Sequence, residues 1–552
     1  MNNNLLRKTQ EWLRRNEWNA ALGAALLAFA LGLAGIRQQQ LALGKPISWA
    51  DAIYFSLRLF TFSFDLQGDG SPYASSPTAL SFARYLAPIP VFYAGMKAVL
   101  LLASQRLALW RIRRWRNHAL VFGAGRRGRL VALNLRSAGR QVIVVEKDPA
   151  NETLAELRAA GVKIIAGSAV DGMCQQQARI EHASLVIALT SSEEANLEVA
   201  LSAGRRCRGK SVLIQAHVSR QFAEEFESHP PFDKVREGVH VRFFDHTAAA
   251  ARLLFREFGP GLAKPAGPDP RILLLGDGEV LIELLKTIVI QGQYAGSRGP
   301  QIRIVTSTEA YQRRFPAHHP QLNLVSRIEF VELTAAPPTL AEDVTPFDLA
   351  FVAFNHDAET IAASRRLLQA QPGMQGRIVA CLRPSTNMLA LLAVKEPVAG
   401  VVFRDLVALG CQTGVLLQDE LDKAAKSVHE RYVAAEIARG QSPQTNTSLV
   451  AWDDLPEALR QANRAQADHV PIKLAILKLA SDPATLEALA EAEHRRWMAE
   501  KIISGWRHGA TRDDSRKLHP SLKPYAELSE PEKQKDRDVI LELVRKAKQE
   551  SS

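Results

Sequence analysis

The chain has 552 residues, of which 47% are hydrophobic and 23% are charged. Because a domain usually holds about 100–200 residues, this length predicts several domains, and the ordinary composition excludes a protein that lies mostly in lipid. The formal net charge of +11 would suit nucleic acid, but basic residues are densest directly after an apolar segment, at Arg106, Arg111, Arg113, Arg114 and Arg116. Membrane topology and anionic lipid explain this basic collar better, so we expect no nucleic-acid partner.

The cysteines and histidines show no metal-binding pattern. Four cysteines lie far apart in the sequence, at Cys174, Cys207, Cys381 and Cys411. We expect them to be buried thiols in a reducing compartment. His318 and His319 precede a proline, which is typical of a loop rather than of a metal site. The sequence therefore predicts no bound metal.

Two apolar segments precede the basic collar. Residues 18–36 contain no charge, and a helix of that length crosses a hydrocarbon core of about 30 Å. Residues 85–104 also have the right length, although they include Pro88, Pro90 and Lys97. Lysine and arginine are frequent before the first segment and after the second, and sparse between them, which places both chain ends in the cytoplasm. We predict a two-pass protein of the cell inner membrane; the alternative is a cleaved signal peptide at 18–36.

A short amphipathic segment lies between the two apolar segments. Residues 48–57 (SWADAIYFSL) begin with a helix-starting serine and are too short to span a membrane. With this segment, residues 18–104 resemble the pore of two-span potassium channels, in which a re-entrant helix lies between an outer and an inner helix. That family continues with Thr-Val-Gly-Tyr-Gly, whose carbonyls replace the hydration shell of potassium, but this chain reads TFSFD at 61–65. The resemblance therefore does not imply potassium selectivity.

Four residues are candidates for the conduction path: Arg58, Thr61, Ser63 and Lys97. Positive charge at Arg58 and Lys97 repels cations and favours a poorly selective or anion-passing pore. Alternatively, Lys97 extends to the interface or pairs with a neighbour, and the unit is only an anchor. Since a pore with one re-entrant segment per chain needs several chains around an axis, we predict a homo-oligomer, namely a tetramer.

A dinucleotide-binding fingerprint follows the collar. Residues 118–122 (HALVF) have the pattern of a short buried strand, and GAGRRG follows at 123–128. A helix pattern occupies 130–137, and the next strand pattern, 141–145, is followed by Glu146. Strand, glycine turn, helix and acidic residue thus occur in the order and spacing that the Rossmann fingerprint requires.

Each part of the fingerprint has a physical role. Gly123 permits the tight turn, Gly125 lets the backbone approach a phosphate, and Gly128 lets the helix pack on the strand. Glu146 would accept both ribose hydroxyls and repel a 2′-phosphate, which favours NAD or an adenine nucleotide over NADP. The alternative is a purely structural turn. The candidate cofactor-binding residues here are Gly123, Gly125, Arg126, Arg127, Gly128 and Glu146, the two arginines as further phosphate contacts unless they are simply solvated.

The strand pattern at 185–189 ends in the turn TSSEEAN at 190–196. With the glycine turn and Glu146, it resembles the N-terminal lobe of regulator of potassium conductance (RCK, also TrkA-N) domains over roughly residues 117–260. Such domains bind NAD or adenine nucleotides, assemble as gating rings and pull on an attached pore. The resemblance adds Thr190 to the candidate cofactor-binding residues.

A second cycle of the same α/β plan begins at 271–279 (RILLLGDGE). Leu281 stands in the third glycine position, and Asp277 and Glu279 put negative charge where a phosphate would lie. We expect this half to be degenerate and structural.

The C-terminal residues change to a helical composition after a polar break at 440–446. EHRRW at 493–497, GWRHG at 505–509 and KLHP at 517–520 resemble the RyR repeat domain of ryanodine receptors and bacterial proteins, which implies adenine nucleotides as ligands. Aromatic faces with cationic neighbours suit a purine nucleotide; the alternative is that the aromatics are only the core of a small domain. The candidate residues of this second ligand site are His494, Trp497, Lys501, Trp506 and Arg512.

The predicted fold class is α/β, with two transmembrane helices, two Rossmann-like (RCK) domains and a small α-helical RyR domain. The expected boundaries are a membrane unit at 1–117, an RCK/TrkA-N domain at 118–268, a degenerate second Rossmann-like domain at 269–440 and the RyR domain at 441–552.

We expect a nucleotide-responsive ion channel-like protein, whose RyR domain would sense a purine second messenger, in one hypothesis a messenger released during phage infection (antiviral defence). The first alternative is a membrane-tethered NAD or adenine-nucleotide sensor that regulates a separate transporter. An NAD-dependent enzyme ranks third, since no His–carboxylate pair, Tyr-x-x-x-Lys or substrate domain follows the fingerprint. We therefore assign no catalytic residue.

Overall fold

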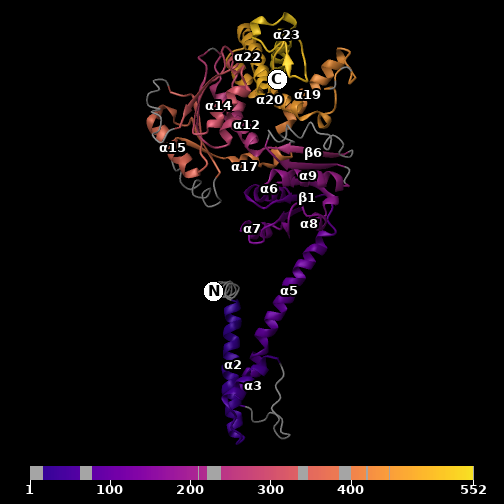
Figure 1. Cartoon of the computed structure of the whole chain (residues 1–552), viewed down its shortest axis with the longest axis vertical. Coiled ribbons are helices and arrows are strands. Elements are labelled where there is room, and N and C mark those ends of the chain that lie inside the picture. Colours follow the sequence, from indigo (N-terminus) through magenta and orange to yellow (C-terminus); the bar gives the residue numbers. More distant parts are fainter. Residues whose placement is uncertain are drawn as a thin grey trace. The chain divides into compact units, whose positions relative to one another are not determined.

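The computed structural model describes residues 17–550 except 62–76, 209–210, 220–237, 266, 334–345, 384–398, 418–420, 445 and 447. The chain divides into two compact units, Met1–Arg114 and Trp115–Ser552. The first unit contains helices α2 (Glu17–Ala42), α3 (Trp49–Arg58), α4 (Thr78–Leu86) and α5 (Pro88–Ile112) and the short 3-10 turn η1 (Leu59–Thr61) (Figure 1).

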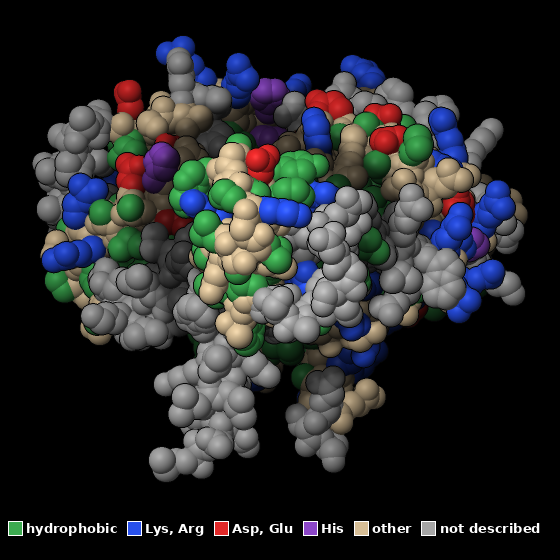
Figure 2. All heavy atoms as spheres, turned by 90° about the horizontal axis from the view of Figure 1, so that it is seen from below, with side chains coloured by type: hydrophobic (Ala, Val, Ile, Leu, Met, Phe, Trp, Pro, Cys, Tyr) green, Lys and Arg blue, Asp and Glu red, His purple; other side chains and the backbone are tan. Residues whose placement is uncertain are grey.

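The described part of the first unit exposes much apolar surface. Most of the large apolar side chains that are exposed belong to it, among them Leu26, Phe82 and Phe92; hydrophobic side chains are green in Figure 2. Such apolar surface is unfavourable in water and favourable in lipid. Among the described residues, one helix, α2, is long and apolar enough to span a membrane by length and composition. The second predicted span remains a prediction.

Within this unit, α2 packs mainly on α4 and also on α5, the helix that contains most of the predicted segment 85–104. A Cβ on Gly35 of α2 would lie 2.7 Å from Leu80 Cβ of α4, so the two helices touch closely there. At the other end of α2, Glu17 forms an ion pair with Lys97. Helices α4 and α5 therefore both lie alongside α2. Lys97 lies level with the first turn of α2, which contains Glu17.

The second unit begins with a six-stranded parallel sheet. Its strands are β1 (His118–Phe122), β2 (Val142–Glu146), β3 (Lys163–Ala166), β4 (Ala183–Ala188), β5 (Val212–His217) and β6 (Val239–Phe244). Its helices are α6 (Arg126–Ser137), α7 (Thr153–Ala159), α8 (Gly172–Gln177), α9 (Glu193–Arg206) and α12 (His246–Phe258). The strand order β3-β2-β1-β4-β5-β6 reverses direction between β1 and β4, as in Rossmann folds. We call this part the first lobe.

A second parallel sheet, the second lobe, has the same plan. Its strands are β7 (Arg271–Gly276), β8 (Gln301–Thr306), β9 (Arg327–Glu332), β10 (Leu349–Ala353), β11 (Ile378–Leu382) and β12 (Val401–Asp405). Its helices are α13 (Val280–Gln291), α14 (Glu309–His318), α15 (Asp357–Ala370), α17 (Leu406–Gly410) and α18 (Thr413–Leu416). Read from β9, the order β9-β8-β7-β10-β11-β12 repeats that of the first lobe. The predicted α/β class with two Rossmann-like sheets is confirmed.

The two lobes exchange their last helices. α12 follows β6 of the first lobe, yet Leu254 and Phe255 on it lie in the same core as α13 of the second lobe. In return, Val407 on α17 and Leu416 on α18 lie in the core of the first lobe. Where α12 and α17 cross, a Cβ on Gly410 would lie 2.1 Å from the His246 carbonyl oxygen. Each sheet is thus completed by residues of the other lobe.

The remaining helices form the C-terminal module. They are α19 (Leu421–Ala438), α20 (Glu457–Asp468), α21 (Val470–Leu477), α22 (Pro483–Ile503) and α23 (Glu530–Glu550), with short strands β13 (Arg507–His508) and β14 (Leu518–His519). The sequence placed α19 before the domain boundary at 440, but α19 packs on α20 and its Asp422 pairs with Arg464 at 2.6 Å. By these contacts α19 is part of the module.

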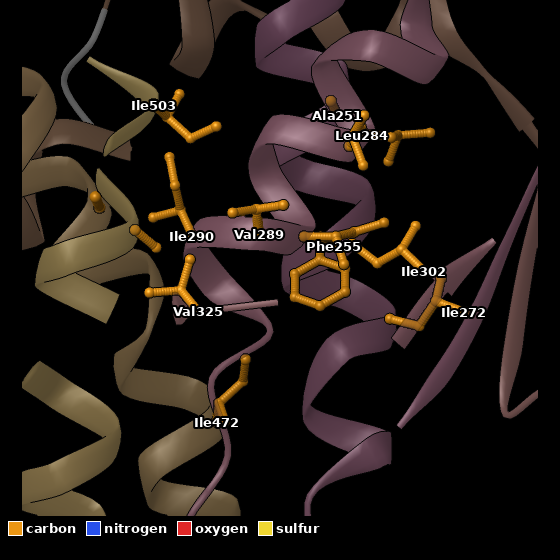
Figure 3. Packing of buried hydrophobic residues seen from close by; sticks show 14 of the residues in the cluster. Ala251, Phe255, Ile272, Leu284, Val289, Ile290, Ile302, Val325, Ile472 and Ile503 are labelled. Atoms are coloured by element: carbon orange, nitrogen blue, oxygen red, sulfur yellow. The ribbon is translucent and has the colours of Figure 1, made fainter. Parts of the chain in front are cut away.

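One hydrophobic core joins this module to the second lobe. Figure 3 shows Val289 and Ile290 of α13 in the same cluster as Ile472 and Ile503 of the module. At the margin of this core, Arg495 Nη2 donates to the Tyr294 carbonyl at 2.9 Å. Continuous packing of this kind makes the second lobe and the module one structural body.

Candidate functional site

The candidate nucleotide site lies at the carboxyl ends of β1 and β4, where the strand order reverses. Gly123 has φ +95°, and a Cβ on it would lie 2.9 Å from the Leu189 carbonyl oxygen. A Cβ on Gly128 would lie 1.9 Å from the Gly123 carbonyl oxygen, whereas a Cβ on Gly125 would have no neighbour within 4 Å. Two glycines therefore close the turn tightly, and the third leaves open space at the N-terminus of α6, where a phosphate would approach.

The carboxylate of Glu146 lies beside this turn. Its Oε2 accepts a hydrogen bond from the Ala124 amide at 2.5 Å, and its Oε1 accepts one from the Asp148 amide at 2.9 Å. Thr153 Oγ1 donates to the Ala124 carbonyl at 2.8 Å. The acceptor for ribose hydroxyls is thus held next to the glycine turn by backbone amides.

Thr190 lies on the opposite side of the turn. Asn196 Oδ1 accepts hydrogen bonds from the Thr190 amide and hydroxyl, both at 2.8 Å, and Asn196 Nδ2 donates to the His217 carbonyl at 2.9 Å. The sequence turn at 190–196 is therefore fixed by one buried amide side chain. Gly123, Gly125, Glu146 and Thr190 come together as the sequence predicted, although their contact with a ligand remains a prediction.

The two arginines of the glycine turn are engaged by the protein. Arg126 donates to the Arg383 carbonyl and lies 3.6 Å from Asp405, and burial lowers its pKa. Arg127 Nη1 lies 2.8 Å from His217 Nε2. Both guanidinium groups thus have protein partners, and their contacts with phosphate remain a prediction.

A histidine pair behind the turn was missed by sequence reasoning. His217 Nε2 lies 2.8 Å from His246 Nδ1. Burial, reinforced by the charge of Arg127, lowers the pKa of His217 to about 2 and that of His246 to about 3, so both imidazoles are neutral at pH 7. Burial also raises the pKa of the neighbouring Asp245. The available signal was the position of each histidine. His217 is the last residue of β5, and His246 is the second residue after the end of β6.

The corresponding turn of the second lobe is more crowded at its middle glycine, although a pocket lined in part by Gly278, Glu279 and Phe354 lies beside it. A Cβ on Gly278 would lie 3.1 Å from the Ala353 carbonyl oxygen, and Leu281 is fully buried. Asp277 accepts a hydrogen bond from the Asn355 amide at 3.0 Å. That the second half is degenerate and structural remains a prediction.

The C-terminal module brings together four of the five predicted residues of the second ligand site. His494 stacks on Trp497 with 5.6 Å between ring centroids, and Lys501 Nζ lies 5.4 Å from the Trp506 ring centre. His519, which the sequence did not single out, joins the two tryptophans, at 5.0 Å from Trp497 and 6.3 Å from Trp506.

Two members of the predicted set have other contacts. Arg512 has a side chain that is 64% exposed and pairs with Asp514 at 2.7 Å. His494 is 3% exposed, and its Nε2 donates to the Lys523 carbonyl at 2.9 Å. Trp497, Lys501 and Trp506 are the residues with partly exposed side chains next to His519, and they carry the candidate site.

The EHRRW motif also builds a buried charge network. Glu493 lies 2.5 Å from Lys473 and 2.9 Å from Arg496. Despite the opposing effect of burial, these two cations hold the pKa of Glu493 well below its usual range. Removing one member would leave a buried charge uncompensated, so the motif has a structural role beside any binding role.

The candidate pore residues lie in the first unit. The Arg58 guanidinium lies 6.0 Å from the Tyr54 ring centre, and Thr61 Oγ1 donates to the Arg58 carbonyl at 3.1 Å. Lys97 pairs with Glu17, whose Oε2 accepts a hydrogen bond from the Tyr93 hydroxyl at 2.8 Å. Ser63 lies outside the described residues. The pairing of Lys97 matches the alternative that it is neutralised by a neighbour.

Comparisons with known proteins identify two segments. Residues 119–229 match the TrkA-N domain and residues 470–548 match the RyR domain, so both of these resemblances are confirmed for these segments.

Solved structures with a similar arrangement include the crystal structure of GsuK bound to ADP, 17% identical over 73% of this chain and 99% of that chain, with a TM-score of 0.39. The GsuK channel bound to NAD is 15% identical over 76% of this chain and 86% of that chain, with a TM-score of 0.40. The TrkA-N domain of the inner membrane protein ybaL from Escherichia coli is 23% identical over 26% of this chain and 98% of that chain, with a TM-score of 0.21. At these TM-scores the likeness carries no functional argument.

Proposed function

We propose that this chain is a nucleotide-responsive, channel-like membrane protein and not an enzyme. NAD or an adenine nucleotide binds at the glycine turn of the first lobe and gates ion passage through the N-terminal unit. The observation that carries the proposal is the open space at Gly125, next to Glu146 and Thr190, at the point where the strand order of a TrkA-N segment reverses. Only five residues, 113–117, separate α5 from β1 in the chain, so a movement of the first lobe acts directly on that helix.

The exchange of helices provides a way for binding to change the assembly. Because α12 and α17 each complete the other lobe, a ligand that shifts the glycine turn also shifts the contact between the lobes. A ligand changes the population of two arrangements by the difference of its affinities for them. Gating requires only that the nucleotide favour one arrangement of the lobes.

The C-terminal module supplies a second input. Trp497, Lys501 and Trp506 would hold a purine nucleotide by stacking and by charge, and the shared core with α13 would pass its effect to the second lobe. A second messenger made during phage infection is one such ligand, which would make the protein an effector of antiviral defence. We further propose that the chain crosses the inner membrane twice, with both termini in the cytoplasm, and assembles as a homotetramer.

The direct test is nucleotide binding by the purified full-length protein in detergent. We expect NAD or an adenine nucleotide to bind in calorimetry, and Gly125→Asp to abolish binding because a carboxylate would stand where the phosphate approaches. Gly373→Asp is the matched control, since a Cβ at Gly373 also has no neighbour within 4 Å. A well-folded protein that binds none of these nucleotides would refute the proposal.

Conductance separates the channel from the second candidate, a tethered sensor of a separate transporter. The sequence TFSFD, in place of a potassium filter, favours that second candidate. In planar bilayers, the channel predicts nucleotide-dependent current whose ion selectivity changes in Arg58→Gln. Absence of current from protein that binds nucleotide would leave the sensor as the function.

A further inference from the structure

Three potential metal ligands converge behind the glycine turn. His217 ends β5, and Asp245 and His246 directly follow the neighbouring parallel strand β6. Their ligand atoms all lie within 4.8 Å of one another, with 2.8 Å between the two imidazole nitrogens and 3.9 Å between His246 Nδ1 and Asp245 Oδ1. The two histidines are 29 positions apart in the sequence and meet only because β5 and β6 pair.

Contacts with neighbouring residues position the side chains of Asp245 and His217. Asp245 Oδ1 accepts hydrogen bonds from the amides of Thr247 and Ala248 at 2.7 and 3.3 Å, so that it caps α12. The ring of Phe244 packs edge-on against His217 with 5.4 Å between centroids. His217 is 9% exposed. Ligands on strand ends and helix caps are positioned more rigidly than ligands on loops.

The spacing of the ligands suits a small transition-metal ion. Ligands bound at about 2.0–2.1 Å in a tetrahedral site lie about 3.3 Å from one another. The distances of 2.8 and 3.9 Å at His246 fall on either side of this value, and all three ligand atoms lie within 4.8 Å of one another, so shifts of at most about 1.5 Å would bring them to this spacing. Two imidazoles and one carboxylate favour zinc and related ions over calcium or magnesium, which prefer oxygen ligands.

The Arg127 guanidinium lies against one member of this cluster, His217. Its Nη1 lies 2.8 Å from His217 Nε2, the atom that would bind the metal. Arg127 belongs to the first turn of α6, next to the open space at Gly125. A metal cation bound to His217 Nε2 would repel a guanidinium at this distance, so we expect a bound metal to displace Arg127.

We propose that His217 Nε2, His246 Nδ1 and the carboxylate of Asp245 bind a divalent transition metal, and that the metal releases Arg127 toward the phosphate of the bound nucleotide. Each imidazole binds through the named nitrogen and carries its proton on the other, so no net proton is released. The second half of this inference rests on the proposed nucleotide site, whereas the metal site does not.

Cobalt(II) is the probe, because its visible absorption reports tetrahedral coordination. Full-length protein without a polyhistidine tag, freed of metal by a chelator, is titrated with Co²⁺ and then with Zn²⁺. We expect one Co²⁺ per chain, displaced by Zn²⁺, and binding about tenfold or more weaker in His217→Ala and His246→Ala. His508→Ala, at an exposed histidine on β13, is the matched control and should bind normally.

Arg127→Gln keeps the test decisive should the histidine variants fail to fold. Removing a positive charge a few ångströms from the metal should strengthen Co²⁺ binding by about tenfold or more, since charge repulsion at that range is large. No tetrahedral Co²⁺ signal in either the wild type or Arg127→Gln would overturn the metal site. Equal binding in His217→Ala and the wild type would overturn it as well.

The coupling is tested by measuring NAD affinity with and without Zn²⁺. We expect Zn²⁺ to strengthen NAD binding in the wild type and to have no effect in Arg127→Gln. If Co²⁺ binds but NAD affinity does not change, the release of Arg127 is wrong and the metal site stands. If Co²⁺ binds and NAD does not bind at all, the failure is that of the proposed function.

Discussion

The two lobes share one strand order but differ at the turn where a nucleotide would bind. In the first lobe a Cβ on Gly125 would meet open space, and Gly128 lets α6 lie against the turn. In the second lobe Gly278 faces the Ala353 carbonyl, and Leu281 takes the position of Gly128. α13 is almost entirely buried, since it packs on its own sheet, on α12 and on α22. Most of α13 therefore serves as core for the C-terminal module, and only its first residue, Val280, borders the pocket beside Gly278 and Glu279.

The largest effect should come from copying the second lobe into the first. Gly128→Leu would place a Cβ 1.9 Å from the Gly123 carbonyl oxygen, so α6 must move away from the turn. We expect destabilisation by about 3 kcal/mol or more and complete loss of NAD binding, measured by thermal unfolding and by calorimetry. NAD affinity within about twofold of the wild type would show that the close approach of α6 is dispensable, which contradicts the role of a Rossmann glycine.

The glycine turn was predictable because its signal is local. Strand, turn, helix and Glu146 lie within 29 residues, and each has its own sequence pattern. The exchange of α12 and α17 was not predictable, since an amphipathic helix does not encode which sheet it covers. The histidine pair was missed for the same reason, because its members meet only when β5 and β6 pair.

In the first unit, the hydropathy of 85–104 located an apolar segment but could not show which residues would meet across the helices. Pro88 begins α5 instead of interrupting it, since proline is tolerated in the first turn of a helix. The resulting register sets Lys97 beside Glu17 and Leu80 beside Gly35. In the C-terminal module, likewise, the aromatic cluster was predicted but the burial of His494 was not, because spacing does not reveal burial.

A substitution at the corresponding position of the second lobe, Leu281, should affect stability alone. Leu281→Ala removes a fully buried side chain from the core around α13 and should destabilise the protein by about 2–5 kcal/mol. NAD binding at the first lobe should keep its affinity, because Leu281 is no part of that site. A large loss of NAD affinity in this variant would mean that the second lobe contributes to the ligand site directly.

The variant Trp497→Ala tests whether the two candidate ligand sites bind nucleotides independently. Stacking of a base on an aromatic ring is worth about 1–3 kcal/mol, so a purine nucleotide should bind the C-terminal module roughly tenfold to a hundredfold more weakly. NAD binding at the glycine turn should not change. Trp452→Ala serves as a control, since Trp452 lies in a separate small cluster with Ala425 and Leu455. Equal loss in both variants would indicate general disruption of the module instead of a site at Trp497.

The smallest expected effect is at Glu146, and it discriminates between nucleotides. Glu146→Gln keeps a hydrogen-bond acceptor near the Ala124 amide but removes the charge, so the turn should persist while the contact with ribose hydroxyls weakens. We expect NAD affinity to fall about tenfold, equivalent to about 1.4 kcal/mol, and NADP affinity to rise because the 2′-phosphate no longer meets a carboxylate. Asp148→Asn, which removes a neighbouring exposed charge, is the matched control. An equal shift of the ratio of NAD to NADP affinity in Glu146→Gln and Asp148→Asn would contradict this role of Glu146. In that case the selectivity arises from the total negative charge at this edge of the sheet and not from hydrogen bonds that Glu146 accepts from the ribose hydroxyls.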